Sequence, residues 1–164
     1  MSSRSLTAPA DHAAAGGTLV LALGNPLRGD DGVGAAVLER LAQAGPPPGA
    51  TLLDGGTPGL ETVLLLQHCA RAIIIDAASM GCAPGEWVRF RVDAVQMQPA
   101  DPTLRGTLHS AGLAEALALG AALGTLPGAV VIYGVEPEAI GWEPGLSAPV
   151  AAAVRRCAPR SWTN

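Results

Sequence analysis

The 164-residue chain contains no lysine, and all ten of its basic side chains are arginines. The absence of lysine excludes Schiff-base chemistry, serine–lysine dyads and the phosphate-binding lysine of P-loop proteins. Aromatic residues make up only 3% of the chain and its three tryptophans are scattered, so no platform for stacking nucleic-acid bases is expected. The net charge of −4 points the same way. We therefore expect no nucleic-acid partner.

Cysteine and long apolar runs are also scarce. The three cysteines are odd in number and show no CxxC spacing, which argues against a disulfide framework or a zinc ribbon and predicts a cytoplasmic protein. The longest apolar stretches, residues 18–23 and 72–75, are too short to cross a bilayer, so no membrane association is expected. Residues 1–17 are polar or small and predict a flexible tail, followed by a single domain over residues 18–164.

The remaining sequence alternates between short apolar runs and segments with helical periodicity. Continuous apolar runs predict buried strands, whereas the polar–apolar alternation of residues 86–93 predicts a strand with one wet face, antiparallel or at a sheet edge. Helices are expected near residues 33–41, 60–69, 110–123 and 147–156, and strands at 18–23, 50–54, 72–76 and 129–134. This order predicts an α/β three-layer sandwich, with a mostly parallel central sheet of about five strands and helices on both faces.

Several chargeable residues fall where these strands end. Asp30 and Asp31 follow the first strand, Asp54 ends the second, Asp76 ends the third, and His109 precedes the third long helix. Because ligands of open α/β sheets bind beyond the carboxyl ends of the strands, we expect these side chains to share one edge. Carboxylates with one imidazole suit a divalent ion such as nickel, zinc, manganese or iron, with positions left open for water or substrate.

Other interpretations of the same residues stay open. Asp54 lies 20 residues after Gly34, where a dinucleotide site would place its ribose-binding acid, but the glycine spacing is wrong and Asp30 and Asp31 would repel a pyrophosphate. No nucleotide cofactor is therefore expected. The paired aspartates could simply cap the following helix, Asp76 could be an ordinary turn residue, and His109 an ordinary residue at a helix entrance. His68, late on an apolar helix, is predicted to be structural.

Six short segments, taken together and in order, carry a resemblance to a known family. They are GNPLRGDDGVG at 24–34, DGGTPG at 54–59, IDA at 75–77, LHSAGL at 108–113, GVEPE at 134–138 and GLS at 145–147. This set resembles the hydrogenase maturation endopeptidases over about residues 18–157. The resemblance implies an α/β enzyme that removes a C-terminal extension from the large-subunit precursor of nickel–iron hydrogenase, after nickel has been inserted.

The resemblance also implies roles for individual residues. Asp31, Asp76 and His109 match the metal-binding positions of the family, which often has Glu in place of Asp31, and Asp54 is a further functional candidate. The metal is expected to be nickel carried by the substrate. Two mechanisms stay open: a metal ion activates water, or the three ligands recognise nickel while a carboxylate such as Asp54 assists proton transfer. The alternatives are a nickel-binding maturation chaperone that does not cut its partner and a nucleotide-dependent α/β enzyme.

Overall fold

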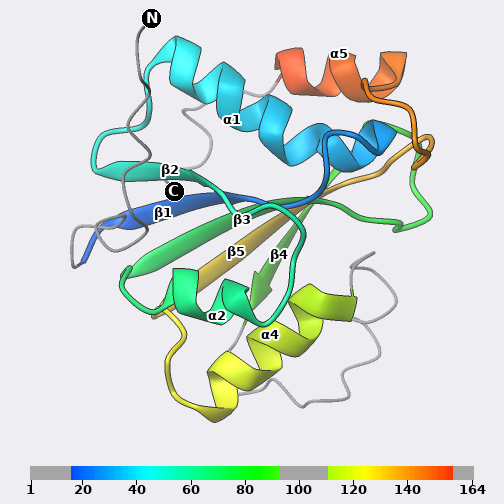
Figure 1. The fold of residues 1–164 in the computed structure, drawn as a ribbon. Coiled ribbons are helices and arrows are strands. Elements are labelled where there is room, and N and C mark those ends of the chain that lie inside the picture. Colours follow the sequence, from blue (N-terminus) through cyan, green and yellow to red (C-terminus); the bar gives the residue numbers. More distant parts are fainter. Residues whose placement is uncertain (1–15, 93–110, 157–164) are drawn as a thin grey trace, which may run out of the picture.

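The structure is a computed structural model, and it describes residues 16–92 and 111–156. The described chain forms a central sheet with helices on both sides (Figure 1). Its elements are, in order, β1 (Thr18–Ala22), the 3₁₀ turn η2 (Gly29–Gly32), α1 (Val33–Ala44), β2 (Ala50–Asp54), α2 (Glu61–Leu66), β3 (Arg71–Ala77), β4 (Trp87–Val92), α4 (Ala111–Ala122), β5 (Ala129–Val135) and α5 (Ala148–Arg156).

The five strands lie in the order β2-β1-β3-β5-β4. All neighbouring pairs are parallel except β4 and β5, which are antiparallel and place β4 at the sheet edge. Helices α1 and α5 cover one face of the sheet, and α2 and α4 cover the other (Figure 1). The predicted three-layer α/β architecture is confirmed, including the single antiparallel edge strand.

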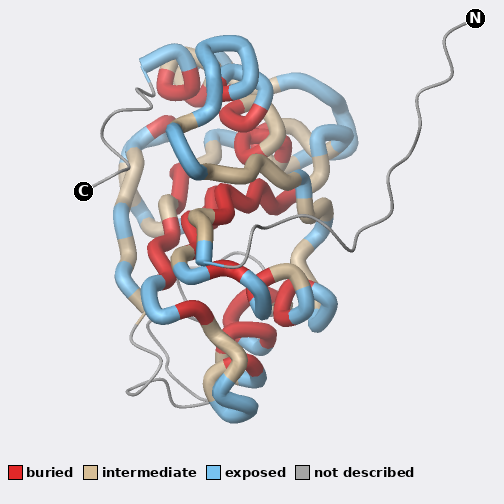
Figure 2. The backbone as a smooth tube through the Cα atoms, turned by 90° about the vertical axis from the view of Figure 1, so that its left-hand side faces the viewer, coloured by how far each residue is buried: buried red, intermediate tan, exposed pale blue. Residues whose placement is uncertain are grey.

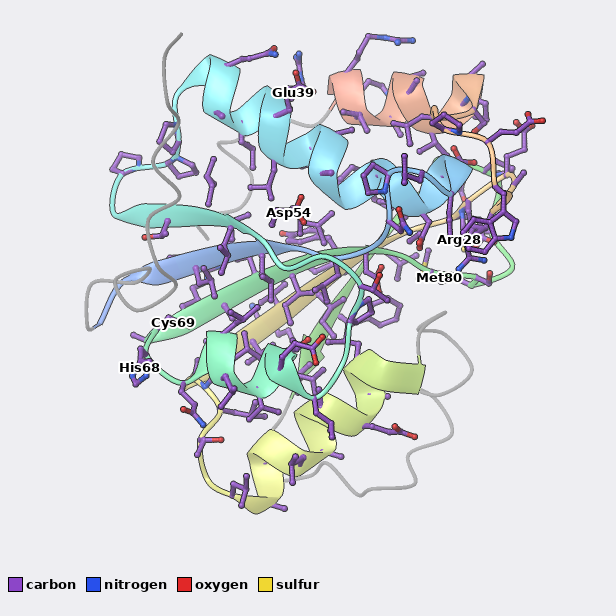
Figure 3. All side chains as sticks on the ribbon, viewed as in Figure 1. Arg28, Glu39, Asp54, His68, Cys69 and Met80 are labelled. Carbon is purple, nitrogen blue, oxygen red and sulfur yellow. The ribbon has the colours of Figure 1, made fainter. Side chains whose placement is uncertain are left out.

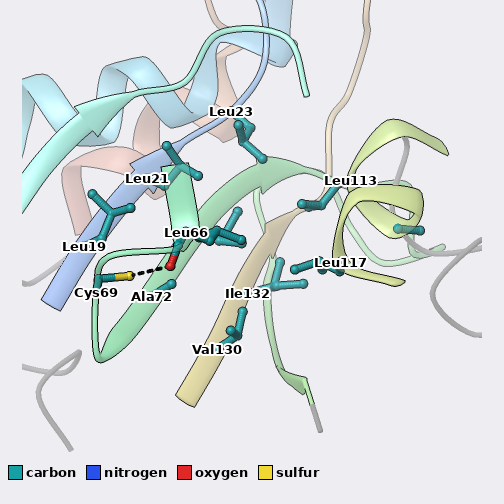
Figure 4. Packing of buried hydrophobic residues seen from close by; sticks show 12 residues of the cluster. Leu19, Leu21, Leu23, Leu66, Cys69, Ala72, Leu113, Leu117, Val130 and Ile132 are labelled. Carbon is teal, nitrogen blue, oxygen red and sulfur yellow. Dashed lines mark hydrogen bonds between the residues drawn. The ribbon is translucent and has the colours of Figure 1, made fainter. Parts of the chain in front are cut away.

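Alternation along the strands divides the core into two layers. In β1, Leu19 and Leu21 face α2 and α4, whereas Val20 faces α1 and α5. Figure 4 shows the first layer, a cluster that contains these leucines together with Leu66 of α2 and Leu117 of α4. Each fully buried leucine stabilises the fold by about 1.5–3 kcal/mol relative to an exposed one. The exposed parts of the chain form the outer loops and the outward sides of the helices (Figure 2).

Two elements differ from expectation. Helix α2 ends at Leu66 rather than near Cys69, because the chain must turn back into the sheet, where the N–H groups of Ala70 and Arg71 donate to the Gly17 carbonyl. The turn η2 was not anticipated, and it inserts a tight turn before α1. None of the helices in the described ranges is long and apolar enough to span a membrane.

Candidate functional site

The loops that follow β1, β2 and β3 are tied together at the carboxyl edge of the sheet. Ala22, near the end of β1, is in register with Asp54 on one side and Ile75 on the other. Beyond the strands, Leu23 donates its N–H to the Ile75 carbonyl at 2.9 Å, and Gly24 donates to the Gly56 carbonyl at 2.9 Å. Residues that are distant in sequence are therefore fixed beside one another at this edge.

Two glycines allow the turn that carries Asp31 to sit against the strand ends. Gly24 has a φ of +112°, and a Cβ atom there would collide with the Asp31 carbonyl oxygen. A Cβ atom at Gly34, in the first turn of α1, would lie 2.6 Å from the Leu23 oxygen and 3.0 Å from the Ile75 oxygen. The glycines of the first motif thus permit close backbone packing against β1 and β3, a role different from cradling a phosphate.

Asp31 is half-buried and oriented by one hydrogen bond. Its Oδ2 accepts the backbone N–H of Asn25 at 2.9 Å, and the Asn25 side chain in turn accepts the N–H of Leu27 at 2.9 Å. The other oxygen of Asp31, Oδ1, accepts no hydrogen bond from any of the described residues. A held carboxylate with one oxygen to spare has the chemistry of a ligand for a divalent cation.

Asp30, next in sequence, has a structural role. It is 1% exposed and accepts four hydrogen bonds: the N–H groups of Glu138, Ala139 and Ser147 and the hydroxyl of Ser147, all between 2.7 and 3.1 Å. Burial on its own would raise the pKa of Asp30, but the hydrogen bonds outweigh it and lower the pKa below the ordinary 3.8. The Asp30 carboxylate therefore joins the η2 turn to the loop between β5 and α5. Ser147 immediately precedes α5, and its hydroxyl donates to Asp30.

Asp76 is 2% exposed near the end of β3. It shares the face of Ala72 and Ile74, which is the face covered by α2 and α4. The first turn of α4 packs closely against the loop after β2. A Cβ atom at Gly112 would lie only 2.5 Å from the Pro58 carbonyl oxygen. The third predicted ligand, His109, lies outside the described residues. Among the residues the structure does describe, no three His, Cys, Asp or Glu side chains form a group that could hold a metal.

Asp54 is at the same edge of the sheet but on the other face. By register it sides with Ala22 and Ile75, whereas Asp76 points the opposite way. Asp54 is exposed, and its Oδ1 accepts the Gly56 N–H at 2.9 Å, while Oδ2 accepts no hydrogen bond from the described part of the chain. The structure therefore separates Asp54 from Asp76, and Asp54 is the more accessible of the two carboxylates.

Glu136 is a buried acid to which sequence reasoning gave no role. It is 8% exposed, and its Oε2 accepts the N–H of Met80 at 2.6 Å and that of Cys82 at 3.2 Å. The Glu136 N–H donates to the Glu86 carbonyl, and the Glu136 carbonyl accepts the N–H of Gly85. Glu136 thus fixes the loop that leaves β3 a few residues after Asp76. The GVEPE segment pointed to this residue, although not to its contacts.

The described cysteines, Cys69 and Cys82, and His68 are not suited to a catalytic role at this edge of the sheet. Burial raises the pKa of the Cys69 thiol, which donates to the Leu66 carbonyl at the far end of the sheet (Figures 3 and 4). Burial raises the pKa of Cys82 as well, with Glu86 and Glu136 adding to the effect. Neither thiol is held as a thiolate. His68 is exposed at that same far end (Figure 3).

A family model described as hydrogenase maturation protease matches residues 35–160. The hydrogenase 2 maturation protease of Escherichia coli is 34% identical over 138 residues, which span 83% of this chain and 82% of that protein. The chain belongs to the hydrogenase maturation protease family. The hydrogenase expression/formation protein of Rhodobacter capsulatus is 34% identical over 124 residues, 73% of this chain. The chain spans only 56% of that protein's length, and 58% of its counterpart in Azotobacter vinelandii.

Solved structures of the hydrogenase maturation protease family share the fold. The hydrogenase maturating endopeptidase of Escherichia coli superposes with a TM-score of 0.69 at 31% identity, covering 84% of this chain and 85% of that one. The [NiFe] hydrogenase maturation protease of Thermococcus kodakarensis gives a TM-score of 0.63 at 28% identity, over 85% of this chain and 92% of that one. The family resemblance of the six sequence segments is therefore confirmed.

Proposed function

We propose that the chain is an endopeptidase that removes the C-terminal extension of a nickel–iron hydrogenase large-subunit precursor after nickel insertion. Membership of the maturation protease family supports the reaction class. The observation that carries the proposal is the position of Asp31 at the strand ends, at the edge where the buried Asp76 lies, with one carboxylate oxygen that accepts no hydrogen bond from the described residues. The precursor would supply the metal as part of the substrate.

In this proposal Asp31, Asp76 and His109 recognise the nickel of the precursor. Asp31 would offer Oδ1, which accepts no hydrogen bond from the described residues, and the N–H of Asn25 would hold the carboxylate in place through Oδ2. Carboxylate and imidazole donors suit a borderline divalent ion. Three such ligands complete the coordination of an ion that is already bound elsewhere, so that binding reports whether the precursor is loaded.

Cleavage is the hydrolysis of one peptide bond. Water adds its oxygen to the scissile carbonyl carbon, the C–N bond breaks, and the leaving amine takes up a proton. Asp54 is the proposed group for proton transfer, because it is exposed and its Oδ2 accepts no hydrogen bond from the described residues. This role requires the scissile bond to reach the end of β2 on the sheet face covered by α1 and α5, whereas Asp76 lies on the opposite face.

The experiment that tests the function uses the purified chain and its cognate precursor, with and without nickel, and follows intact mass. Loss of the extension from the loaded form alone supports the proposal. Binding of the loaded precursor with no mass change contradicts it and supports a maturation chaperone. A second series with the enzyme stripped of metal separates the mechanisms, because full activity on loaded precursor excludes a resident catalytic metal.

A further inference from the structure

Arg28, in the loop before η2, carries a charge that the described protein does not neutralise. Its guanidinium carbon lies 5.0 Å from the centre of the Trp142 ring, and its Nε is buried without a hydrogen-bond partner. Arg28 makes no ion pair with any residue in the described ranges. A half-buried arginine with no carboxylate partner among the described residues can pair with an acidic group from another molecule.

Trp142 contacts this guanidinium from a second loop, between β5 and α5. The side chain is 81% exposed, so it contributes little to the core, and its contact with Arg28 is a cation–π interaction. The loop that carries Trp142 is fastened beside it, because Gly29 donates its N–H to the Glu143 carbonyl at 2.9 Å. The Arg28 backbone is also fixed, since its carbonyl accepts the N–H of Asp31.

A hollow of about 510 Å³ opens beside Trp142. A second hollow of about 220 Å³ extends along α1 as far as Glu39, and the two share Gly29, Gly145 and Leu146 in their walls. Because the two hollows share three lining residues, we treat them as one surface path along which a segment of extended polypeptide can lie. Glu39 and Glu143 line this path and would repel an anion, so an acidic group of a bound peptide would be directed toward Arg28.

We propose that Arg28, held by Trp142, binds a carboxylate of the precursor's C-terminal tail and so positions the tail for cleavage. The inference rests on the proposed function and specifies how its substrate is recognised. A guanidinium presents planar, paired N–H donors that match a carboxylate. Arg28 lies three residues before Asp31 and is hydrogen-bonded to it through the backbone, so the tail would be bound close to the carboxylate proposed to read the nickel.

The test compares the wild-type chain with Arg28→Gln, Arg28→Lys and Trp142→Ala. The control is Arg40→Gln, which removes an exposed arginine on α1. Binding of loaded precursor and the cleavage constants are both measured, over a range of salt concentrations. Arg28→Gln should raise Kd and KM about tenfold, leave kcat nearly unchanged and flatten the salt dependence, because one charge-assisted contact is lost. Arg28→Lys should recover part of the affinity, Trp142→Ala should lose part of it, and Arg40→Gln should match the wild type.

Two precursor variants identify the carboxylate. One has an amidated C-terminus, and the other has the acidic side chains of its tail replaced by amides. The precursor variant that lacks the carboxylate bound by Arg28 should have the same affinity for the wild-type enzyme and for Arg28→Gln, as a double-mutant cycle requires. Equal affinity and equal salt dependence of the wild type and Arg28→Gln on the unmodified precursor overturn the inference. If the wild-type chain binds the precursor more tightly than Arg28→Gln does but does not cut it, the protease function is refuted and the carboxylate site is still supported.

Discussion

Asp30 accepts both the N–H and the hydroxyl of Ser147, 117 residues further along the chain, at 2.7 and 2.8 Å. With the N–H groups of Glu138 and Ala139, these bonds fasten the turn before α1 to the loop that leads into α5. Asp31, the next residue, is thereby held at the carboxyl edge of the sheet. The two adjacent aspartates therefore differ in role: Asp30 fixes the turn, and Asp31 keeps one oxygen that accepts no hydrogen bond from the described residues.

Replacing Asp30 by Asn should destabilise the fold. The amide keeps the shape of the carboxylate but turns one acceptor into a donor among four converging donors, so at least one buried N–H or O–H loses its partner. We expect a loss of about 2–4 kcal/mol in the free energy of unfolding, measured with denaturant. The matched control is Asp54→Asn, at an exposed carboxylate with one hydrogen bond. Equal losses in the two variants would contradict the structural role of Asp30.

The contribution of Asp30 should depend on pH. Its pKa is lower in the folded chain than in the unfolded one, where it is about 3.9, so the carboxylate stabilises the fold fully above that value. The stabilisation is lost as the pH falls through the lower, folded pKa. The difference in unfolding free energy between the wild type and Asp30→Asn should therefore be constant from about pH 5 to 8 and shrink below about pH 4. A difference that grows on acidification would refute this account.

The sequence predicted features that depend on neighbouring residues better than features that depend on residues far apart in the chain. The buried strands follow from short apolar runs such as residues 72–76, and the edge position of β4 from its alternation. The family follows from the ordered motifs. The resemblance assigned Asp31, rather than Asp30, to the metal. The partners of Asp30 could not be predicted, because they lie more than 100 residues away and most are backbone N–H groups, which leave no signature in sequence.

The face on which a side chain lies was also beyond the sequence argument. Asp54 and Asp76 were both expected at one edge of the sheet, and both lie there. Whether they share a face of the sheet depends on strand register, and the structure places them on opposite faces. A shift of one residue reverses the face of a side chain, and register is set by the packing of the whole sheet. The role of Glu136 in fixing the loop after β3 was not predicted either, because its hydrogen bonds to Met80 and Cys82 span more than 50 residues.

Glu136→Ala should loosen the loop that follows β3. The N–H groups of Met80 and Cys82 would lose their acceptor, at a cost of about 1–3 kcal/mol in unfolding free energy. Glu136→Gln retains a carbonyl oxygen in nearly the same place and should lose less. Hydrogen exchange at these two amides is the direct readout, and unchanged protection in Glu136→Ala would show that Glu136 does not hold the loop.

Removal of a proposed nickel ligand should abolish processing and leave the fold intact. Asp76→Asn replaces the charged carboxylate by a neutral amide and His109→Ala removes the imidazole, whereas Asp31→Glu keeps the carboxylate and should retain activity. Cleavage is followed by intact mass, and folding by thermal unfolding. His68→Ala is the matched histidine control, since His68 is exposed at the opposite end of the sheet (Figure 3). Normal processing by Asp76→Asn or His109→Ala would remove that residue from the ligand set.

The most direct test of the central claim is the mass of a cognate large-subunit precursor after incubation with the wild-type chain, with and without nickel. We expect the nickel-loaded precursor to lose its C-terminal extension and the nickel-free precursor to stay intact. Cleavage of both forms would show that nickel is not recognised. Binding of the loaded form without any loss of mass would contradict the assignment as a protease.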